Sequence, residues 1–259
     1  MFASLWSWLS RAGSAVLLGG RVILFLIAFR FDRRQTHEQL ILVGPESLLI
    51  ALITSGCIGM IFTIQVASEF LKLGASTTVG GVLGIAMARE LSPIITAVVV
   101  AARVGAAYAA ELGTMRVTEQ IDALYTLKTD PVEYLVVPRA LACCIMVPIL
   151  SILSLVVGML GGLFLANAMF SITPLIFLNS IQNFLGVWDL VSGPIKGIVF
   201  GIFIAIIGCN WGLTTRGGAK GVGQSTTAAV VTAILAIIVS NFFLSWVMFG
   251  GNNSSSTFL

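Results

Sequence analysis

The feature that most limits the fold of this chain is a set of five long apolar segments separated by shorter polar stretches. A helix needs about 20 apolar residues to cross the hydrocarbon core of a bilayer, and each segment reaches that length. The composition agrees, because 58% of the residues are hydrophobic and only 10% are charged. We therefore predict an all-α membrane protein with about five transmembrane helices. The expected spans are residues 48–71, 82–110, 140–170, 193–213 and 226–249.

The polar stretch of residues 111–124 separates the second expected span from the third. It must lie outside the hydrocarbon, because each charge at the bilayer centre costs about 2.5–3.5 kcal/mol. Thr118 is expected to cap a short helix in which Ile121 and Leu124 share one face. The polar side chains of that helix then point elsewhere. The helix is either a docking surface for a soluble partner or a solvated connection between two spans.

The sequence of this stretch, ELGTMRVTEQIDAL, resembles the signature of the MlaE family of ABC-transporter permeases. These are the membrane subunits of lipid transporters that work with MCE proteins. Residues 88–93, Ala-Arg-Glu-Leu-Ser-Pro, are similar to a second family segment, with a serine in place of the usual glycine. Residues 128–132 and the pair Pro138 and Arg139 resemble two further landmarks in the same order. The resemblance covers about residues 31–250.

The resemblance implies a permease that forms a homodimer and binds a separate ABC ATPase. It also implies an MCE-domain partner on the outer side and the movement of phospholipid or a related lipid between membranes. The residues expected to couple to the ATPase are Glu111, Arg116, Glu119, Gln120, Ile121 and Asp122. ATP hydrolysis is not expected in this chain itself, because it has no GxxxxGK[ST] phosphate-binding motif.

Two charged residues, Arg89 and Glu90, lie inside the second expected span, where unpaired charges are costly. Adjacent helical positions point in different directions, so the two side chains are not expected to pair with each other. Gln65 and Glu69 in the first span are candidate partners at a similar depth. A buried guanidinium also suits a phosphate group. The four residues form either an interhelical polar clamp or a lipid-headgroup site, which the resemblance places near a lipid cavity at the dimer interface.

Charge placement predicts the orientation of the chain in the membrane. Most Lys and Arg residues occur in the N-terminal segment and in the loops of residues 111–139 and 214–224. The positive-inside rule therefore places these parts, including the N-terminus, in the cytoplasm. Arg103 is expected near this interface, where it either extends toward water or pairs with Glu111 of the same or a neighbouring chain.

The chain is expected to divide into three parts. Residues 1–39 form an N-terminal interfacial amphipathic segment, residues 40–250 the permease domain, and residues 251–259 a short polar tail. Residues 171–191 are expected to form a further interfacial helix. The expected location is the cell inner membrane, or alternatively a plastid inner envelope membrane; the N-terminal sequence is unlike a transit peptide.

Two other classes of function remain as alternatives. An ion-coupled secondary transporter would use Glu90 or Glu69 as its proton site with Arg89 as partner, although the sequence has no convincing internal repeat. A membrane-embedded lipid-modifying enzyme would need a catalytic set, which cannot be assembled around the single histidine, His37. No catalytic residue, metal site, cofactor or nucleic-acid partner is expected.

Overall fold

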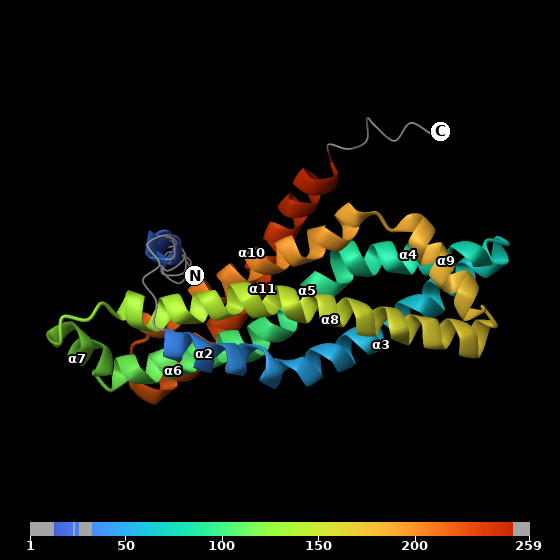
Figure 1. The fold of residues 1–259 in the computed structure, drawn as a ribbon. Helices are drawn as coiled ribbons and strands as arrows, with labels where there is room; N and C mark the ends of the chain where they lie inside the picture. Colours follow the sequence, from blue (N-terminus) through green and yellow to red (C-terminus); the bar gives the residue numbers. More distant parts are fainter. Residues whose placement is uncertain (1–12, 23, 26–32, 251–259) are drawn as a thin grey trace, which may run out of the picture. The chain divides into compact units, whose positions relative to one another are not determined.

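The computed structural model of the chain describes residues 13–22, 24–25 and 33–250, and these residues form helices without any β-strand (Figure 1). The α-helices from residue 33 onward are α2 (Arg33–Val43), α3 (Pro45–Lys72), α4 (Val79–Ala86), α5 (Ser92–Val100), α6 (Ala106–Val117), α7 (Gln120–Thr126), α8 (Val137–Phe170), α9 (Pro174–Phe184), α10 (Val187–Leu213) and α11 (Gly218–Phe249). Four short segments interrupt them: the 3₁₀-helix η1 (Ser76–Thr78) and the π-helices η2 (Met87–Leu91), η3 (Ala101–Gly105) and η4 (Val132–Val136). The predicted all-α class is confirmed.

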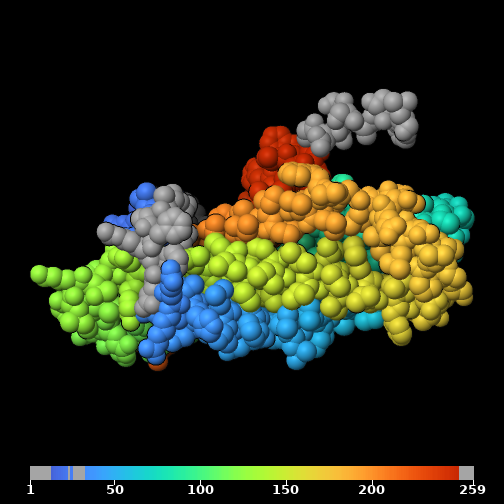
Figure 2. Space-filling model, in the orientation of Figure 1, coloured from blue at the N-terminus to red at the C-terminus, as the bar shows by residue number. Residues whose placement is uncertain are grey.

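Five helical stretches of the described residues are long and apolar enough to cross a membrane, in agreement with the five predicted spans. They are Arg33–Lys72, Ser76–Val117, Val132–Phe170, Val187–Leu213 and Gly218–Phe249. The exposed side chains of α8, part of whose surface is visible in Figure 2, are largely apolar, as contact with lipid tails requires. They include Ile149, Ile152, Val156, Leu160 and Phe164.

Several expected boundaries were wrong. Helix α2 continues across residue 39, the expected end of the N-terminal segment, and residues 218–224, expected in a loop, form the first turns of α11. In place of one helix over residues 171–191, the structure has the shorter α9. Residues 187–191 at the end of the expected range belong to the start of α10. Most of the expected interfacial segment at residues 1–39 lies outside the described residues, although residues 13–22 are helical.

The chain forms two compact units, and each is assembled from three separate parts of the sequence. Unit 1 comprises Met1–Ser47, Val100–Met146 and Ile198–Ile237. Unit 2 comprises Leu48–Val99, Val147–Gly197 and Ile238–Leu259. Each long helix from α8 to α11 except α9 therefore contributes residues to both units, so neither unit is a continuous domain of the chain.

Small residues allow close backbone packing within unit 2. A Cβ atom added to Gly59 of α3 would lie 2.0 Å from the carbonyl oxygen of Gly158 on α8. A Cβ on Gly161 would lie 2.7 Å from the carbonyl oxygen of Gly56. These two helices therefore meet backbone to backbone, which small residues permit.

The same kind of contact seats α9 beside α4 in unit 2. A Cβ on Gly80 would lie 2.4 Å from the carbonyl oxygen of Phe177. Phe177 is buried with Leu83 and Met87 in one apolar cluster. The backbone N–H of Gly81 donates a hydrogen bond to Ser180 Oγ at 2.9 Å. Apolar burial and this hydrogen bond together position α9 against the start of α4.

We predict that Gly59→Ala lowers stability although alanine is the better helix former. The new methyl group has no space at the α3–α8 contact, and overpacking of this kind costs about 1–3 kcal/mol. The measurement is the thermal unfolding midpoint of the purified protein in detergent. Gly223→Ala is the matched control, because a Cβ at that position of α11 meets nothing within 4 Å. Equal midpoints for the two variants would contradict the close α3–α8 contact.

Candidate functional site

Arg89 and Glu90 of the second span lie in the π-helix η2, where the α-helical pattern is interrupted. Such π-helical turns are frequent at functional sites. As expected from their adjacent positions, Arg89 and Glu90 do not pair with each other, and each has its own set of partners in unit 2. We call the group of Arg89, Glu90, Asp189, Lys196, Asn241 and Ser245 the Arg89 cluster.

Glu90 is held by three donors from two other helices. Lys196 Nζ of α10 donates at 2.8 Å, Asn241 Nδ2 of α11 at 2.7 Å and Ser245 Oγ of α11 at 2.7 Å. Lys196 is completely buried, and its ammonium group also donates to the carbonyl oxygen of Arg89 at 2.7 Å and to Ser245 Oγ at 2.8 Å. All three N–H donors of the lysine are therefore satisfied, as a buried ammonium group requires.

Arg89 remains the accessible cation of the cluster. Its Nε donates to Asp189 Oδ1 at 2.7 Å, and its guanidinium carbon lies 4.4 Å from the centre of the Phe249 ring. The arginine side chain is 35% exposed, whereas the side chain of Asp189 is only 6% exposed. Asp189 also accepts a hydrogen bond from the Gly186 backbone N–H at 2.9 Å, which fixes the carboxylate. The cluster thus presents one partly exposed guanidinium on a buried, charge-balanced base.

The prediction that Gln65 and Glu69 are the partners of Arg89 and Glu90 was wrong. Glu69 pairs instead with Lys72 at 2.8 Å on an exposed part of α3, and Gln65 is exposed. Sequence depth along a span does not reveal which helices are neighbours, and here α10 supplies the acidic partner of Arg89. Lys196 carried a usable signal, because a lysine inside an apolar span needs an anion.

Arg103 and Arg139 form ion pairs within unit 1. Arg103 of η3 donates to the Leu42 carbonyl oxygen and to Ser47 Oγ, each at 3.0 Å, and it pairs with Glu46. Glu111 pairs instead with Arg139 at 2.8 Å, so the expected pairing of Arg103 with Glu111 of the same chain was wrong.

Arg139 is nearly completely buried and contacts Glu111, the first residue of the polar stretch. Its side chain is 4% exposed, and its guanidinium carbon is 5.4 Å from the centre of the Tyr108 ring. It therefore joins α8 to α6 through both a charge pair with Glu111 and an aromatic contact. Glu111 itself is half exposed, with a side-chain accessibility of 50%.

The expected short helix of the polar stretch is α7, in unit 1. Ile121 is buried, whereas Glu119, Gln120 and Asp122 are exposed. Arg116 at the end of α6 pairs with Asp122 at 2.5 Å and so braces the turn between the two helices.

Thr118 was expected to cap the start of α7, and this was wrong. Its hydroxyl donates backward to the Thr114 carbonyl oxygen at 2.9 Å, so Thr118 ends α6. Glu119 precedes α7 in the left-handed backbone region, with φ of 63°. That conformation turns the chain sharply between α6 and α7 and exposes the acidic side chain.

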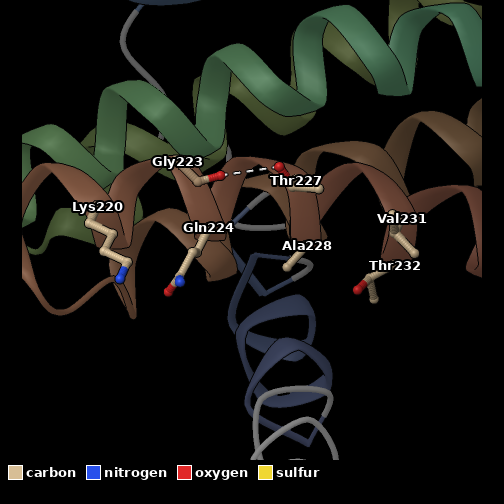
Figure 3. A pocket seen from close by; sticks show the side chains of 7 residues that line it. All are labelled: Lys220, Gly223, Gln224, Thr227, Ala228, Val231 and Thr232. Atoms are coloured by element: carbon tan, nitrogen blue, oxygen red, sulfur yellow. Dashed lines mark hydrogen bonds between the residues drawn. The ribbon is translucent and has the colours of Figure 1, made fainter.

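One hollow of about 660 Å³ lies along α11 in unit 1 (Figure 3). It is lined by Lys220, Gly223, Gln224, Thr227, Ala228, Val231 and Thr232. All seven residues come from the same helix. The Thr227 hydroxyl already donates a hydrogen bond to the Gly223 carbonyl oxygen at 3.2 Å. In the part of the chain that the structure describes, no group of three or more metal-ligating side chains is found.

The fold and the Arg89 cluster define a multi-span helical membrane protein with a charged site inside its spans. The sequence model of the family described as Permease MlaE matches residues 36–247, so the chain belongs to this family of ABC-transporter permeases.

Three relatives illustrate its range. A probable ABC transporter permease of Synechocystis is 60% identical over 98% of this chain and 96% of its own length. The chloroplastic protein TRIGALACTOSYLDIACYLGLYCEROL 1 of Arabidopsis thaliana is 45% identical over 97% of this chain and 73% of its own length. A probable ABC transporter permease, ycf63, of Pyropia yezoensis is 44% identical over 96% and 94%, respectively. The chain is therefore a membrane permease subunit.

We predict that Lys196→Met strongly destabilises the protein, because it leaves the Glu90 carboxylate without its cation. Removing one partner of a fully buried pair costs about 3–5 kcal/mol, and the partial exposure of Glu90 reduces this loss. The double variant Lys196→Met/Glu90→Gln removes both charges and should recover part of that loss. A double-mutant cycle of thermal unfolding midpoints measures the coupling.

Lys72→Met is the control for this cycle. Lys72 forms an ion pair with Glu69 over the same distance, but both side chains are more than two-thirds exposed. Exposed pairs contribute about 0–1 kcal/mol. Similar losses for Lys72→Met and Lys196→Met would contradict a structural role for the buried pair.

Proposed function

We propose that this chain is the permease subunit of an ABC transporter that moves phospholipid or a related lipid between membranes. In this proposal two copies assemble with a separate ATPase and an MCE-domain protein in an inner membrane. The N-terminus lies in the cytoplasm. Membership of the MlaE permease family supports the transport role. The Arabidopsis relative is named after a galactosylated diacylglycerol, and this name supports a lipid substrate.

The observation that carries the lipid proposal is the partly exposed guanidinium of Arg89. A phosphate oxygen can accept hydrogen bonds from an arginine fork, and such charge-assisted bonds are stronger than neutral ones. Phe249 lies beside the guanidinium and offers an apolar surface next to the cation. This combination suits an amphiphile with an anionic headgroup. Glu90 is assigned here to holding the site together, while Gln65 and Glu69 remain predicted lipid contacts on the exposed face of α3.

The coupling proposal rests on α7 and its surroundings. The exposed residues Glu119, Gln120 and Asp122 would contact the ATPase, with Arg116 bracing Asp122 and Ile121 anchoring the helix. Glu111 would transmit motion through its pair with buried Arg139. Closure of the ATPase dimer would then move α6 and α7 and change access to the lipid site.

We predict that Glu119→Lys weakens copurification of the ATPase by roughly tenfold or more, because it reverses a charge at the proposed contact. The tagged chain is purified in mild detergent, and its partners are quantified by mass spectrometry. The wild-type eluate should contain an ATPase, an MCE-domain protein and phospholipid.

Glu38→Lys is the matched control, since Glu38 is an exposed glutamate of α2 outside the polar stretch. ATPase recovery that is equal for the two variants would contradict docking through α7. A wild-type chain that elutes without any ATPase would contradict the proposed function as a whole.

We predict that Arg89→Ala reduces bound phospholipid by about tenfold, because it removes the charge-assisted hydrogen bonds to the phosphate. Lipid is extracted from the purified protein and quantified by mass spectrometry, and the oligomeric state is measured by light scattering. Arg34→Ala, which removes an exposed arginine of α2, is the control. Unchanged lipid together with loss of the dimer would show that the cluster is a packing clamp.

An ion-coupled secondary transporter remains the second candidate, because Glu90 is a carboxylate inside a membrane span with 37% of its side chain exposed. It would move its substrate without an ATPase. Uptake into vesicles that depends on a proton gradient and not on ATP would favour this candidate over the ABC permease.

A further inference from the structure

A second hollow lies in unit 2, away from the charged side chains of the Arg89 cluster, between α9 and the start of the second span. It has a volume of about 310 Å³, and we call it the α9 pocket. The chain crosses the membrane twice between Thr78 and α9, so the two walls of the pocket belong to the same membrane face. The charge distribution predicts that this is the non-cytoplasmic face.

The lining of the α9 pocket is polar but uncharged. Five of its seven residues carry neutral hydrogen-bonding groups: Thr77, Thr78, Asn179, Ser180 and Asn183. No lining residue among those described is Asp, Glu, Lys or Arg. A phosphate or carboxylate would find no cation here, whereas hydroxyl and carboxamide groups both donate and accept hydrogen bonds.

Two of the polar side chains are available for a ligand. Asn179 and Asn183 are one helical turn apart on the same face of α9, and both are exposed. Among the described residues, neither carboxamide has a hydrogen-bond partner. Ser180 between them is buried and fixed by the Gly81 N–H, but its own hydroxyl proton remains to be donated.

Two apolar side chains complete the lining, Ile176 and Phe184. The Phe184 ring packs against Gly81, where an added Cβ would lie 2.5 Å from the ring, and 44% of the residue remains exposed. The pocket thus combines an aromatic surface with convergent amide and hydroxyl groups. Its volume is near the lower end of the range of about 300–1,000 Å³ for small-molecule sites, which suits one headgroup rather than a whole lipid.

We propose that the α9 pocket binds a neutral polyhydroxylated group of the size of a hexose. Its ring hydroxyls would bond to Asn179 and Asn183, and its C–H face would pack on Phe184. The source is either the sugar headgroup of a glycolipid or a free sugar. This site is separate from the anion site proposed at Arg89, and its occupancy does not depend on transport.

The test is native mass spectrometry of the full chain in mild detergent with three probes of identical acyl chains. They are a monohexosyl diacylglycerol, phosphatidic acid and the unsubstituted diacylglycerol. The hexosyl lipid should bind about fivefold or more above the diacylglycerol, as expected for a few added hydrogen bonds. N179A/N183A should abolish this preference and leave phosphatidic acid binding unchanged.

Gln182→Ala is the matched control, because Gln182 is exposed on α9 but does not line the pocket. It should retain the preference. Equal binding of the hexosyl lipid and the diacylglycerol to the wild type would overturn the proposal. So would a preference that survives in N179A/N183A, because the sugar would then bind elsewhere on the protein. Unchanged thermal midpoints show that the variants are folded.

An excess of methyl hexoside distinguishes the two sources. Displacement of the hexosyl lipid shows that the pocket recognises a free sugar. A retained preference without displacement shows recognition of a membrane-anchored headgroup. Loss of phosphatidic acid binding in Arg89→Ala, with the hexosyl preference intact, would separate this site from the site of the proposed function.

Discussion

The ion pair between buried Lys196 and partly exposed Glu90 is the interaction on which unit 2 depends most. An unpaired charge inside a membrane span is costly, so each of these two side chains needs a partner of opposite charge. The ammonium group of Lys196 links its own helix α10 to η2, through Glu90 and the Arg89 carbonyl oxygen, and to α11, through Ser245. Because Glu90 is neutralised in this way, the adjacent Arg89 is free to pair with Asp189 and to keep part of its guanidinium exposed.

Close backbone packing makes this polar arrangement possible. The glycines of α3 and α8 let these helices touch, and Gly193 of α10 lies so close to the Ala88 carbonyl oxygen that an added Cβ would be 2.9 Å away. That contact brings the start of α10 against η2 and places both Asp189 and Lys196 within reach of the charged pair. Larger side chains would separate the helices, and charged groups separated in hydrocarbon lose far more than dispersion energy.

The sequence was sufficient to predict the spans and the exposed polar helix, but not the partners inside the site. Hydropathy determines which segments enter the membrane, because backbone groups in lipid must be satisfied within helices. It does not determine which helices are neighbours, so Gln65 and Glu69 were chosen by depth whereas Asp189 and Lys196 are the actual partners. The prediction that Thr118 caps α7 was wrong for a local reason, because a threonine hydroxyl can also donate backward, and here it donates to the Thr114 carbonyl oxygen of α6.

The acidic partner of Arg89 also bears on how an anionic headgroup would bind in the proposed transporter. A phosphate at Arg89 must share or displace Asp189, a carboxylate already held 2.7 Å from Nε and fixed by Gly186. The gain from the new charge-assisted bonds is therefore reduced by the bond that is given up. A transport site has to release what it binds, and sites that bind too tightly conduct poorly. In the proposed transporter the buried Asp189 would serve this requirement, because it would restore a neutral cluster as soon as the headgroup left.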